Sequence, residues 1–458
     1  MAGEVAHELD EQSWLYRPSF PDEWKRISLL SMARWVNGLV FRDFQFSDTG
    51  KPIIKIAEIK GGITGQTKFT NQAFEESIFV TNGNMLFSWS GQPETSIDVF
   101  WWRGRDGWLN QHIFKVTPIE ELDPVFFFYV LRYLKPNFIG IARNKQTTGL
   151  GHVTRRDIEN IEAAFPPVAE QKAIAAVLGA LDDKIELNRR MNATLEAMAR
   201  ALFQSWFVDF DPVRAKLDGR KPIGLDETTA ALFPNSFENS ELGHIPKGWN
   251  VRALSDLTSL ITKGTTPTQD DMAGAPDPDA QINYVRVNSI DEDGSVLADK
   301  LTTIPESVHA GVLKRSILMA NDVLYTIAGT IGRLALAEDW MLPANTNQAV
   351  AIIRPEPEIP SGFLILTMRH EVFRKELHNN IVQAVQANLS LGMLSKARVV
   401  VPPQSILQQL FRPIDALLSQ ISANRAQSRT LATLRDTLLP KLLSGELSVA
   451  ETEKEASA

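Results

Sequence analysis

Residues 166–206 read PPVAEQKAIAAVLGALDDKIELNRRMNATLEAMARALFQSW, and a second version of this stretch begins at Pro402. A constant shift of 236 positions places PPQSILQQLFRPIDALLSQISANRA on PPVAEQKAIAAVLGALDDKIELNRR without a gap. Under this shift Asn188 falls on Asn424. The repeat indicates that one structural element occurs twice in the chain.

A stripe of mainly apolar residues runs through each copy at alternating steps of four and three, the spacing that keeps one face of a helix against a partner helix. In the first copy the stripe is Ile174, Leu178, Leu181, Ile185, Asn188, Asn192, Leu195, Ala199, Leu202 and Trp206. In the second copy it is Leu410, Ile414, Leu417, Ile421, Asn424, Ser428, Leu431, Arg435, Leu438 and Leu442, where Arg435 fits least well. We therefore expect two long antiparallel helices that form a coiled coil, the first of about 38 residues and about 57 Å.

Two features of these helices lead to further expectations. Pro413 and Pro440 lie inside the second helix, so we expect that helix to bend or to be interrupted there. Asn188 and Asn424 share a stripe position near the middle of the helices. We expect them to face each other and fix the register, because a buried amide needs a partner. The alternative is that they cap solvent-facing turns.

The repeat extends to the sequence that precedes each helix. PDEWKRISL at 21–29 resembles PKGWNVRAL at 246–254, and Asn110-Gln111 resembles Asn347-Gln348. Strand-like runs bounded by Gly, Asn and Asp alternate with helical pieces in both halves, which predicts mixed domains with small, mainly β cores. The fold class is therefore α+β, with two pseudo-repeated mixed α/β domains separated by the two long helices.

The predicted order along the chain follows from these boundaries. It comprises a first domain at 1–164, a spacer helix at 165–208, a connector at 209–245, a second domain at 246–400, a second spacer helix at 401–446 and a flexible tail at 447–458. The connector is rich in Pro, Gly, Asn and acids and reads as a folded link rather than a domain.

Composition excludes several classes of protein. The 458 residues carry a net charge of −8 and no cysteine, so neither disulfides nor thiolate metal sites can form. The acidic start of the chain does not resemble a signal peptide, and the longest apolar run, 124–131, is too short to span a bilayer. We expect a cytoplasmic protein. The seven histidines are scattered, so no metal site is expected.

Catalytic motifs are absent from the sequence. It has no GxxxxGK[ST] phosphate loop, GxGxxG fingerprint, GxSxG elbow or HExxH pair. PDEWK at 21–25 and LDDK at 181–184 only superficially resemble nuclease carboxylate–lysine sets, since the first recurs without its acids and the second lies on the coiled coil. We therefore expect no enzymatic site in this chain.

The first domain contains a basic stretch suited to nucleic acid. No acidic residue occurs between Asp123 and Asp157, whereas Arg, Lys and amide side chains are frequent there. Arg and Lys bind phosphate and guanine, and Asn or Gln can bond adenine at two places. The candidate DNA-binding residues of this domain are Arg143, Lys145, Gln146, His152, Arg155 and Arg156, with Arg103 and Arg105 of WWRGRDGW. The alternatives are a solvated basic face and a hairpin tip whose tryptophans are partly packed.

The second domain offers a similar set with less charge and more glycine and amide. TKGTTPT at 262–268 and GTIGR at 329–333 place small residues where a backbone can approach another polymer. The candidates are Lys263, Thr265, Thr266, Arg333, Asn347, Gln348 and Asn388. The glycine-containing pieces can equally be turns.

The chain resembles the specificity subunits of type I restriction-modification systems. The resemblance rests on FPPVAEQKAIAAVLGALDDKIELNRRMNATLEAMARALFQSWFVDFDPVRAK, on FPNSFENSELGHIPKGW and on LLPKLLSGEL. It implies two target-recognition domains, each reading one half of a bipartite site in double-stranded DNA, and helices that set the gap between the halves. It also implies two methyltransferase subunits, which use S-adenosylmethionine, and optionally two restriction subunits, which use ATP and Mg²⁺. No cofactor is expected on this chain.

Two other classes of function compete with this interpretation. A stand-alone DNA methyltransferase or nuclease is disfavoured because no cofactor loop or [DN]PP[YFW] motif occurs. A coiled-coil adaptor that binds no nucleic acid is favoured by the acidic net charge. Phe203, Trp206, Phe207 and Phe210 at the end of the first helix leave a further alternative open, because they could pack as core or form a docking face for a methyltransferase subunit.

Overall fold

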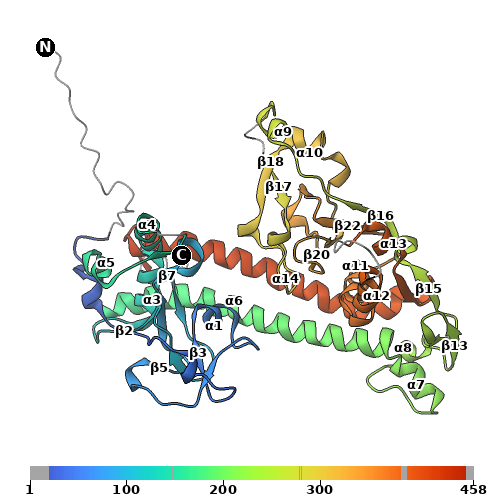
Figure 1. The fold of residues 1–458 in the computed structure, drawn as a ribbon, viewed down its shortest axis with the longest axis horizontal. Coiled ribbons are helices and arrows are strands. Elements are labelled where there is room, and N and C mark those ends of the chain that lie inside the picture. The colour runs from blue at the N-terminus through green and yellow to red at the C-terminus, as the bar shows by residue number, and fades with distance from the viewer. Residues whose placement is uncertain (1–19, 147–148, 278, 280, 383–388, 450–458) are drawn as a thin grey trace, which may run out of the picture. The chain divides into compact units, whose positions relative to one another are not determined.

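The computed structural model describes residues 20–146, 149–277, 279, 281–382 and 389–449. The chain divides into two compact units, one made of the chain up to Asn188 and from Ala426 onward, the other of Arg189–Arg425. Each unit contains one mixed domain and part of each long helix (Figure 1). Each unit also has its own hydrophobic core.

The first domain alternates short strands and short helices. Its strands are β1 (Lys25–Ser28), β2 (Ala33–Asn37), β3 (Lys51–Ile54), β4 (Phe69–Thr70), β5 (Phe79–Val80), β6 (Met85–Ser88), β7 (Ser90–Gly91), β8 (Asp98–Trp101), β9 (Gly107–Leu109), β10 (Ile113–Pro118), β11 (Gly151–His152) and β12 (Glu162–Phe165). Its helices are α1 (Ile56–Gly61), α2 (Pro93–Ser96), α3 (Pro124–Tyr133), α4 (Lys135–Asn144) and α5 (Arg155–Asn160).

Two four-stranded sheets organise this domain. The first is antiparallel in the order β2-β10-β6-β8, and the second has the order β4-β3-β9-β5 with β3 and β9 parallel. Strand β1 pairs antiparallel with β12, so the start of the domain is joined to the strand that leads into the first long helix.

Helices contribute more to the first core than the sequence predicts. Helix α3 begins where the Asp123 carboxylate accepts hydrogen bonds from the amides of Val125 and Phe126, with Pro124 at the first helical position. Seven of the ten side chains of its PVFFFYVLRY sequence are buried. The expectation of a small, mainly β core is therefore wrong, because an almost wholly apolar helix covers the sheet.

The second domain repeats this arrangement. Its strands are β15 (Asn250–Ala253), β16 (Thr258–Lys263), β17 (Gln281–Val285), β18 (Thr302–Pro305), β19 (Val323–Thr326), β20 (Leu334–Leu336), β21 (Ala344–Thr346), β22 (Val350–Pro355) and β23 (Arg398–Val401). Its helices are α9 (Gln269–Ala273), α10 (Glu306–Ala310), α11 (Ser361–Arg369), α12 (Glu371–Val382) and α13 (Leu391–Lys396).

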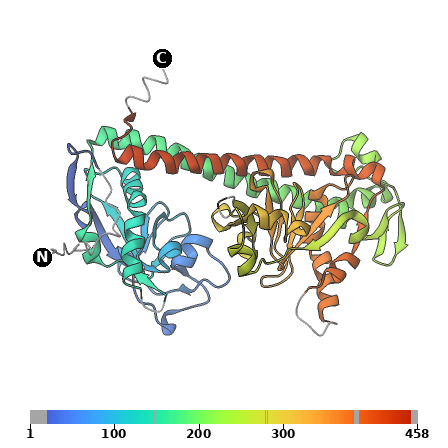
Figure 2. The same cartoon turned by 90° about the horizontal axis from the view of Figure 1, so that it is seen from above.

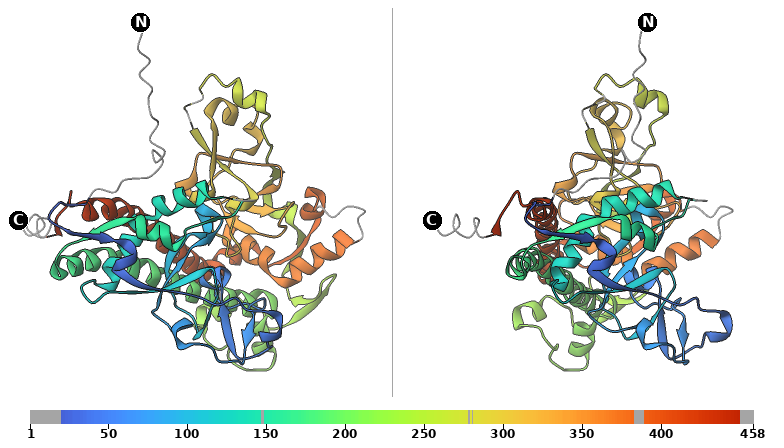
Figure 3. Two further views of the ribbon diagram at one scale, coloured as in Figure 1. Left: turned by 60° about the vertical axis from the view of Figure 1, so that its left-hand side comes forward. Right: turned by 90° about the vertical axis from the view of Figure 1, so that its left-hand side faces the viewer.

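The four-stranded antiparallel sheet of the second domain matches that of the first, and its second sheet has three strands where the first domain has four. The antiparallel sheet has the order β16-β22-β19-β20, and the second sheet has the order β18-β17-β21 with β17 and β21 parallel. Strand β15 pairs with β23, as β1 pairs with β12. Helix α10 lies against β17 and β18, in the yellow part of the ribbon (Figure 3). The predicted repeat of two mixed domains is confirmed.

The connector between the halves is folded, as predicted. It contains α7 (Asp211–Leu217), α8 (Glu227–Ala231) and a hairpin of β13 (Phe237–Ser240) and β14 (Gly243–Pro246). A π-helical turn at Gln204–Val208 leads into it. This turn packs Phe207 between Trp249 and the rings of Phe363 and Phe411.

The two long helices are α6 (Val168–Phe203) and α14 (Gln404–Leu443), and they are antiparallel in each unit (Figure 2). In the first unit Asp182 contacts Arg435 and Asn188 contacts Ser428. All residues of both predicted stripes are buried or half-buried, including Arg435. The coiled coil predicted from the stripe spacing is confirmed.

Helix α14 runs through both of its prolines without interruption. A proline removes the hydrogen bond to the carbonyl four residues earlier, which belongs to Gln409 for Pro413 and to Asp436 for Pro440. Both Gln409 and Asp436 are exposed, so water can solvate the released carbonyls. The expected interruption is therefore wrong, and the expected bend stays a prediction. Beyond the helix, Val449 is buried at 7% exposure, so packed chain continues past the predicted end of the second spacer helix.

Candidate nucleic-acid interface

A cluster of polar side chains forms where β16 ends in the second domain. Gly264 crosses the loop between β21 and β22 so closely that an added Cβ would lie 1.9 Å from the Thr346 carbonyl oxygen. Only glycine permits this approach. The next residues, Thr265 and Thr266, are thereby fixed beside Asn347 and Gln348.

Hydrogen bonds hold this cluster. The Thr266 hydroxyl bonds the Gln348 side-chain oxygen, and both side chains are exposed. The Tyr284 hydroxyl donates to the Thr265 carbonyl oxygen at 2.8 Å, which ties the loop to β17. The Asn347 side chain accepts from the Ala349 amide at 3.2 Å. The arrangement presents a pre-positioned amide and hydroxyl to solvent, groups that can bond base edges.

Three other candidates of this domain differ in their surroundings. Lys263 is exposed at the end of β16, next to the cluster. Arg333 is half-buried, and it donates to the Ile290 carbonyl oxygen at 2.8 Å and contacts Glu292 at 3.5 Å, so it holds a turn of the domain. Asn388 lies outside the described residues.

The basic stretch of the first domain is not free of acids in space. Arg143 on α4 donates to Glu94 at 2.6 Å, and Lys145 donates to both oxygens of Asp157 at 2.5 and 2.7 Å. Lys135 pairs in the same way with Asp98 at 2.5 Å. The absence of acids within this stretch of sequence is therefore compensated in space, because the fold brings acids from other segments to it.

These pairs shift the pKa values of the two acids. The hydrogen bond from Arg143 lowers the pKa of Glu94 below its ordinary value. Burial alone would raise the pKa of Asp157, but hydrogen bonds from Lys145 and Thr154 outweigh burial and lower it. Asp157 is also part of a capping box with Thr154 that starts α5. Lys145 therefore has a structural role in addition to any contact with DNA.

The remaining basic candidates of the first domain are more accessible. Arg155 and Arg156 are exposed at the start of α5, and Arg155 reaches the Trp35 carbonyl oxygen at 3.4 Å. Gln146 donates to the Gly149 carbonyl oxygen at 2.7 Å, and His152 is half-buried on β11. Among the residues described, neither arginine has an acidic partner, so both keep charge available for phosphate.

The WWRGRDGW segment forms a tight turn between β8 and β9. Trp102 is 3% exposed, and its indole donates to the Arg105 carbonyl oxygen at 3.0 Å. Gly104 lies so close to the Trp102 ring that an added Cβ would clash with it. The tryptophans therefore belong to the domain interior, whereas Arg103 and Arg105 remain exposed at the tip.

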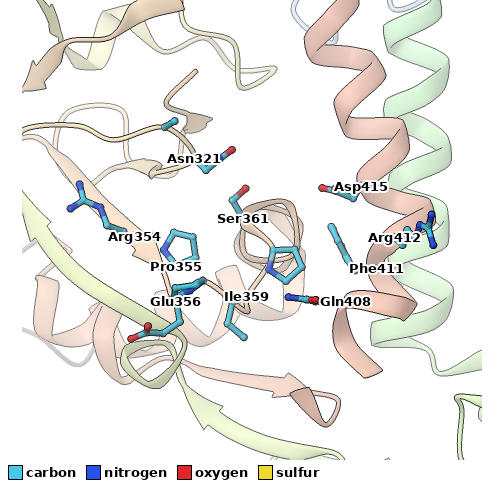
Figure 4. Close-up of a pocket in the computed structure, with 13 residues that line it drawn as sticks. Asn321, Arg354, Pro355, Glu356, Ile359, Ser361, Gln408, Phe411, Arg412 and Asp415 are labelled. Atoms are coloured by element: carbon cyan, nitrogen blue, oxygen red, sulfur yellow. The ribbon is translucent and has the colours of Figure 1, made fainter. Parts of the chain in front are cut away.

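A groove of about 630 Å³ in the second unit separates the loop before α11 from helix α14 (Figure 4). Arg354 at the edge of the groove donates to both carboxylate oxygens of the buried Asp322 at 2.8 Å, so the charge of Arg354 is neutralised within the domain. Ser361 is the one hydroxyl among the lining residues, and neither histidine nor lysine lies with it. The groove therefore has no arrangement typical of nucleophilic catalysis.

Two further features of the described residues concern ligands and membranes. Nowhere in these residues do three or more His, Asp or Glu side chains gather as metal ligands would. Of the helices that the structure describes, none combines the length and hydrophobicity needed to cross a bilayer.

The aromatic residues at the end of α6 pack as core. Phe203, Trp206, Phe207 and Phe210 are between 4% and 7% exposed and lie among the buried residues of the second unit. Their counterparts in the second copy, Leu439, Leu442 and Leu443, are buried in the first unit. Of the two alternatives left open by the sequence, the structure supports core packing.

Two domains of one topology, each followed by one of two long helices and each presenting exposed loops, define a recognition protein built from two repeated halves. The family model described as "Type I restriction modification DNA specificity domain" matches residues 21–197 and 246–431. The chain therefore belongs to the family of type I DNA-specificity subunits. Members of this family work in a complex with DNA and other subunits.

Individual relatives agree with this assignment. The type I restriction enzyme HindI specificity subunit of Haemophilus influenzae is 27% identical over 67% of this chain and 73% of its own length. The EcoBI specificity subunit of Escherichia coli is 26% identical over 97% of this chain and 90% of its own. The crystal structure of a type I restriction-modification S subunit from M. genitalium superposes with a TM-score of 0.54 at 14% identity, covering 93% of this chain and 99% of that one, which shows the shared fold.

Proposed function

We propose that each domain of this chain reads one half of a bipartite DNA site, and that the chain itself is a noncatalytic recognition subunit. The observation that carries the proposal is the repeat of one domain topology, in which each copy places an exposed loop beside a strand end. Two copies of one reading surface in a single chain suit a target with two separate parts.

The long helices have two roles in this proposal. They set the number of base pairs between the half-sites, and they bind two methyltransferase subunits. Three apolar side chains on α6, Leu187, Met191 and Met198, are 38% to 50% exposed. Steps of four and seven place them on one helix face, beside the buried stripe, which suits a protein partner.

In this proposal the partner subunits, and not this chain, carry out the catalytic reactions. The methyltransferase subunits use S-adenosylmethionine, and two restriction subunits, where the system has them, use ATP and Mg²⁺. This chain binds no cofactor in the proposal and acts in the cytoplasm, where it meets cellular DNA. Support comes from the missing catalytic motifs in the sequence and from the groove beside α14, which lacks a nucleophile–base arrangement.

Domain exchange tests the proposal. Residues 21–165 should be replaced by the equivalent residues of a relative with a different target, because this range keeps β1 together with its partner β12. Mapping of methylated adenines in host DNA should then show one changed half-site and an unchanged second half-site and gap. The matched control replaces 246–401, which keeps β15 with β23 and should change the other half-site alone. A change of both half-sites after either exchange would refute the two-domain proposal.

A further inference from the structure

The loop cluster of the second domain has a counterpart of equal backbone geometry in the first domain. Gly38 and Gly264 both approach a backbone carbonyl so closely that no Cβ would fit, at the oxygen of Asn110 in one domain and of Thr346 in the other. The surrounding hydrogen bonds correspond one by one. In the first domain the amide of Gly38 donates to Ile113 O, that of Leu39 to Leu109 O and that of Ile113 to Asn110 O. In the second domain the equivalent amides of Gly264, Thr265 and Val350 donate to Val350 O, Thr346 O and Asn347 O, in the same order.

This register makes Val40 equivalent to Thr266 and Gln111 equivalent to Gln348. In the second domain the Thr266 hydroxyl bonds the Gln348 side-chain oxygen. Valine has no hydroxyl, so the first domain cannot form this bond. Within the described residues, the Gln111 side-chain oxygen is buried and has no hydrogen-bond partner, while its Nε2 lies 3.2 Å from His112 Nε2. The Gln111 oxygen therefore has no partner among the described residues, whereas the equivalent oxygen of Gln348 is bonded to Thr266.

The first domain exposes apolar side chains where the second exposes hydroxyls. Val40 is 57% exposed, and Leu39 beside it is 37% exposed. Exposed apolar residues in a backbone geometry that both domains share are unfavourable in water and suit contact with an apolar group. In the major groove of DNA the apolar group available is the 5-methyl of thymine.

We propose that residue 40 and residue 266 are equivalent specificity-determining positions, and that each acts together with the glutamine beside it. In the second domain Thr266 orients Gln348 to bond an adenine through N6 and N7. In the first domain Val40 contacts the methyl group of a thymine. This inference rests on the proposed function, since it requires that the domains read base edges.

The chemistry of the glutamine supports this assignment. Gln348 keeps both Nε2–H donors and a second lone pair on its oxygen after bonding Thr266. A donor for N7 and an acceptor for the N6 amino group are the two groups by which glutamine selects adenine. The bond from Thr266 removes rotational freedom that binding would otherwise have to remove, and it therefore favours this geometry over others.

Modified bases provide the test, with the chain assembled with its methyltransferase subunits. The target is first obtained by mapping methylated adenines, and domain exchange assigns its halves. Each adenine of the second half-site is then replaced in turn by 7-deazaadenine, which lacks N7. One position should weaken binding of the unsubstituted chain about tenfold and leave binding of Gln348→Leu unchanged. Thr266→Val should show a reduced effect at that same position.

The first half-site is tested by replacing each thymine with uracil, which removes the methyl group. One position should weaken binding of the unsubstituted chain about fourfold, the effect of one buried methyl, and leave binding of Val40→Ser unchanged, because serine has no methyl group to contact the thymine. Val40→Thr should also raise the thermal midpoint by about 2 °C, because it supplies the donor that Gln111 lacks. Thr228→Val, at an exposed position of α8, is the matched control and should respond like the unsubstituted chain.

The outcomes separate this inference from the proposed function. Loss of all sequence preference in the unsubstituted complex would refute the proposed function itself. Specific binding in which no 7-deazaadenine effect depends on Gln348 would overturn the adenine assignment alone. Specific binding to a first half-site without thymine, or with uracil effects that Val40→Ser does not remove, would overturn the thymine assignment alone.

Discussion

Asn424 on α14 donates a hydrogen bond from Nδ2 to the Oδ1 of Asn192 on α6 at 2.8 Å. In the other unit Asn188 donates to Ser428 at 3.2 Å and to Gln427 at 2.9 Å. The 236-position shift carries Asn188 onto Asn424 and Ser428 onto Asn192, so the Asn424–Asn192 and Asn188–Ser428 bonds are equivalent under the internal repeat. Both donors are buried, at 0% and 5% exposure, which excludes the alternative that they cap solvent-facing turns. A direct contact between Asn188 and Asn424 stays a prediction.

These buried amides lead to a prediction about helix register. A shift of one helix along the other would leave these amides without hydrogen-bond partners in the apolar interface between the helices, at a cost of about 1 to 3 kcal/mol for each. The double substitution Asn188→Leu, Asn424→Leu should keep the helices paired but relax their alignment. If the helices set the gap, binding should then discriminate less between DNA sites whose gaps differ by one base pair. Ala197→Leu, at an exposed position of α6, should leave gap preference unchanged. An unaltered preference in the double variant would contradict a role of these amides in register.

Arg435 occupies the stripe position that fits the apolar pattern least well, and the structure explains its presence. Its side chain is 12% exposed and bonds Asp182 at 2.5 Å, while the Tyr129 hydroxyl donates to the same carboxylate at 2.7 Å. Burial and the bond to Asp182 raise the pKa of Tyr129 above its ordinary value, so this hydroxyl stays protonated. The three side chains join α3, α6 and α14 in one polar network.

Removal of one member of this network should destabilise the protein. Asp182→Ala leaves Arg435 largely buried with only the exposed Asp436 as a partner, and should lower the free energy of unfolding by about 2 to 4 kcal/mol, measured by urea denaturation. The double variant Asp182→Leu, Arg435→Leu should lose less, because no buried charge remains unpaired. Asp183→Ala, at the exposed neighbouring position, is the control. Equal losses in the single and double variants would show that the charge itself does not cause the effect.

The Lys145–Asp157 pair predicts a pH dependence of stability. Because the folded state lowers the pKa of Asp157, the pair stabilises the fold fully above the unfolded pKa of about 4, and this contribution is lost as pH falls through the lower folded pKa. Asp157→Asn should therefore unfold at a lower temperature than the unsubstituted chain at pH 7. The difference should remain constant down to about pH 4 and shrink below it. A difference that persists unchanged to pH 2 would show that the effect does not depend on the charge of Asp157.

The helices and the repeat could be predicted from sequence because both depend on local periodicity. The four-and-three spacing of the stripe gives the buried face directly, and a single shift of 236 aligns the copies. The interruption of the second helix at its prolines was predicted wrongly because the effect of a proline depends on whether water can solvate the released carbonyl, which the sequence does not specify. The reason for an arginine at position 435 of the stripe could not be predicted, because its partner Asp182 lies 253 residues away.

The candidate site was harder to predict because it depends on long-range pairing. Arg143 meets Glu94 across 49 residues, so a stretch without acids in sequence is compensated in space. Val40 was not selected as a candidate, since an exposed valine has no distinctive pattern of its own. The available signal was the repeat: Asn110-Gln111 matches Asn347-Gln348, and the glycine before each loop is equivalent. Reading both copies together identifies positions that neither copy identifies alone.

The pairing of the basic residues leads to the last prediction, which distinguishes two arginines of one stretch. Arg156 is exposed and has no acidic partner among the residues described, whereas Arg143 bonds Glu94 at 2.6 Å. If Arg156 contacts a phosphate, Arg156→Ala should weaken DNA binding equally for all target sequences and reduce the slope of log K against log salt by about 1. Arg143→Ala should change the slope less, because part of its charge is already neutralised within the domain. Titrations of the assembled complex at several salt concentrations measure both slopes. A larger change in slope for Arg143→Ala than for Arg156→Ala would mean that DNA displaces Glu94 from Arg143. Equal slopes for both variants and the unsubstituted chain would show that this surface is solvated and does not contact DNA.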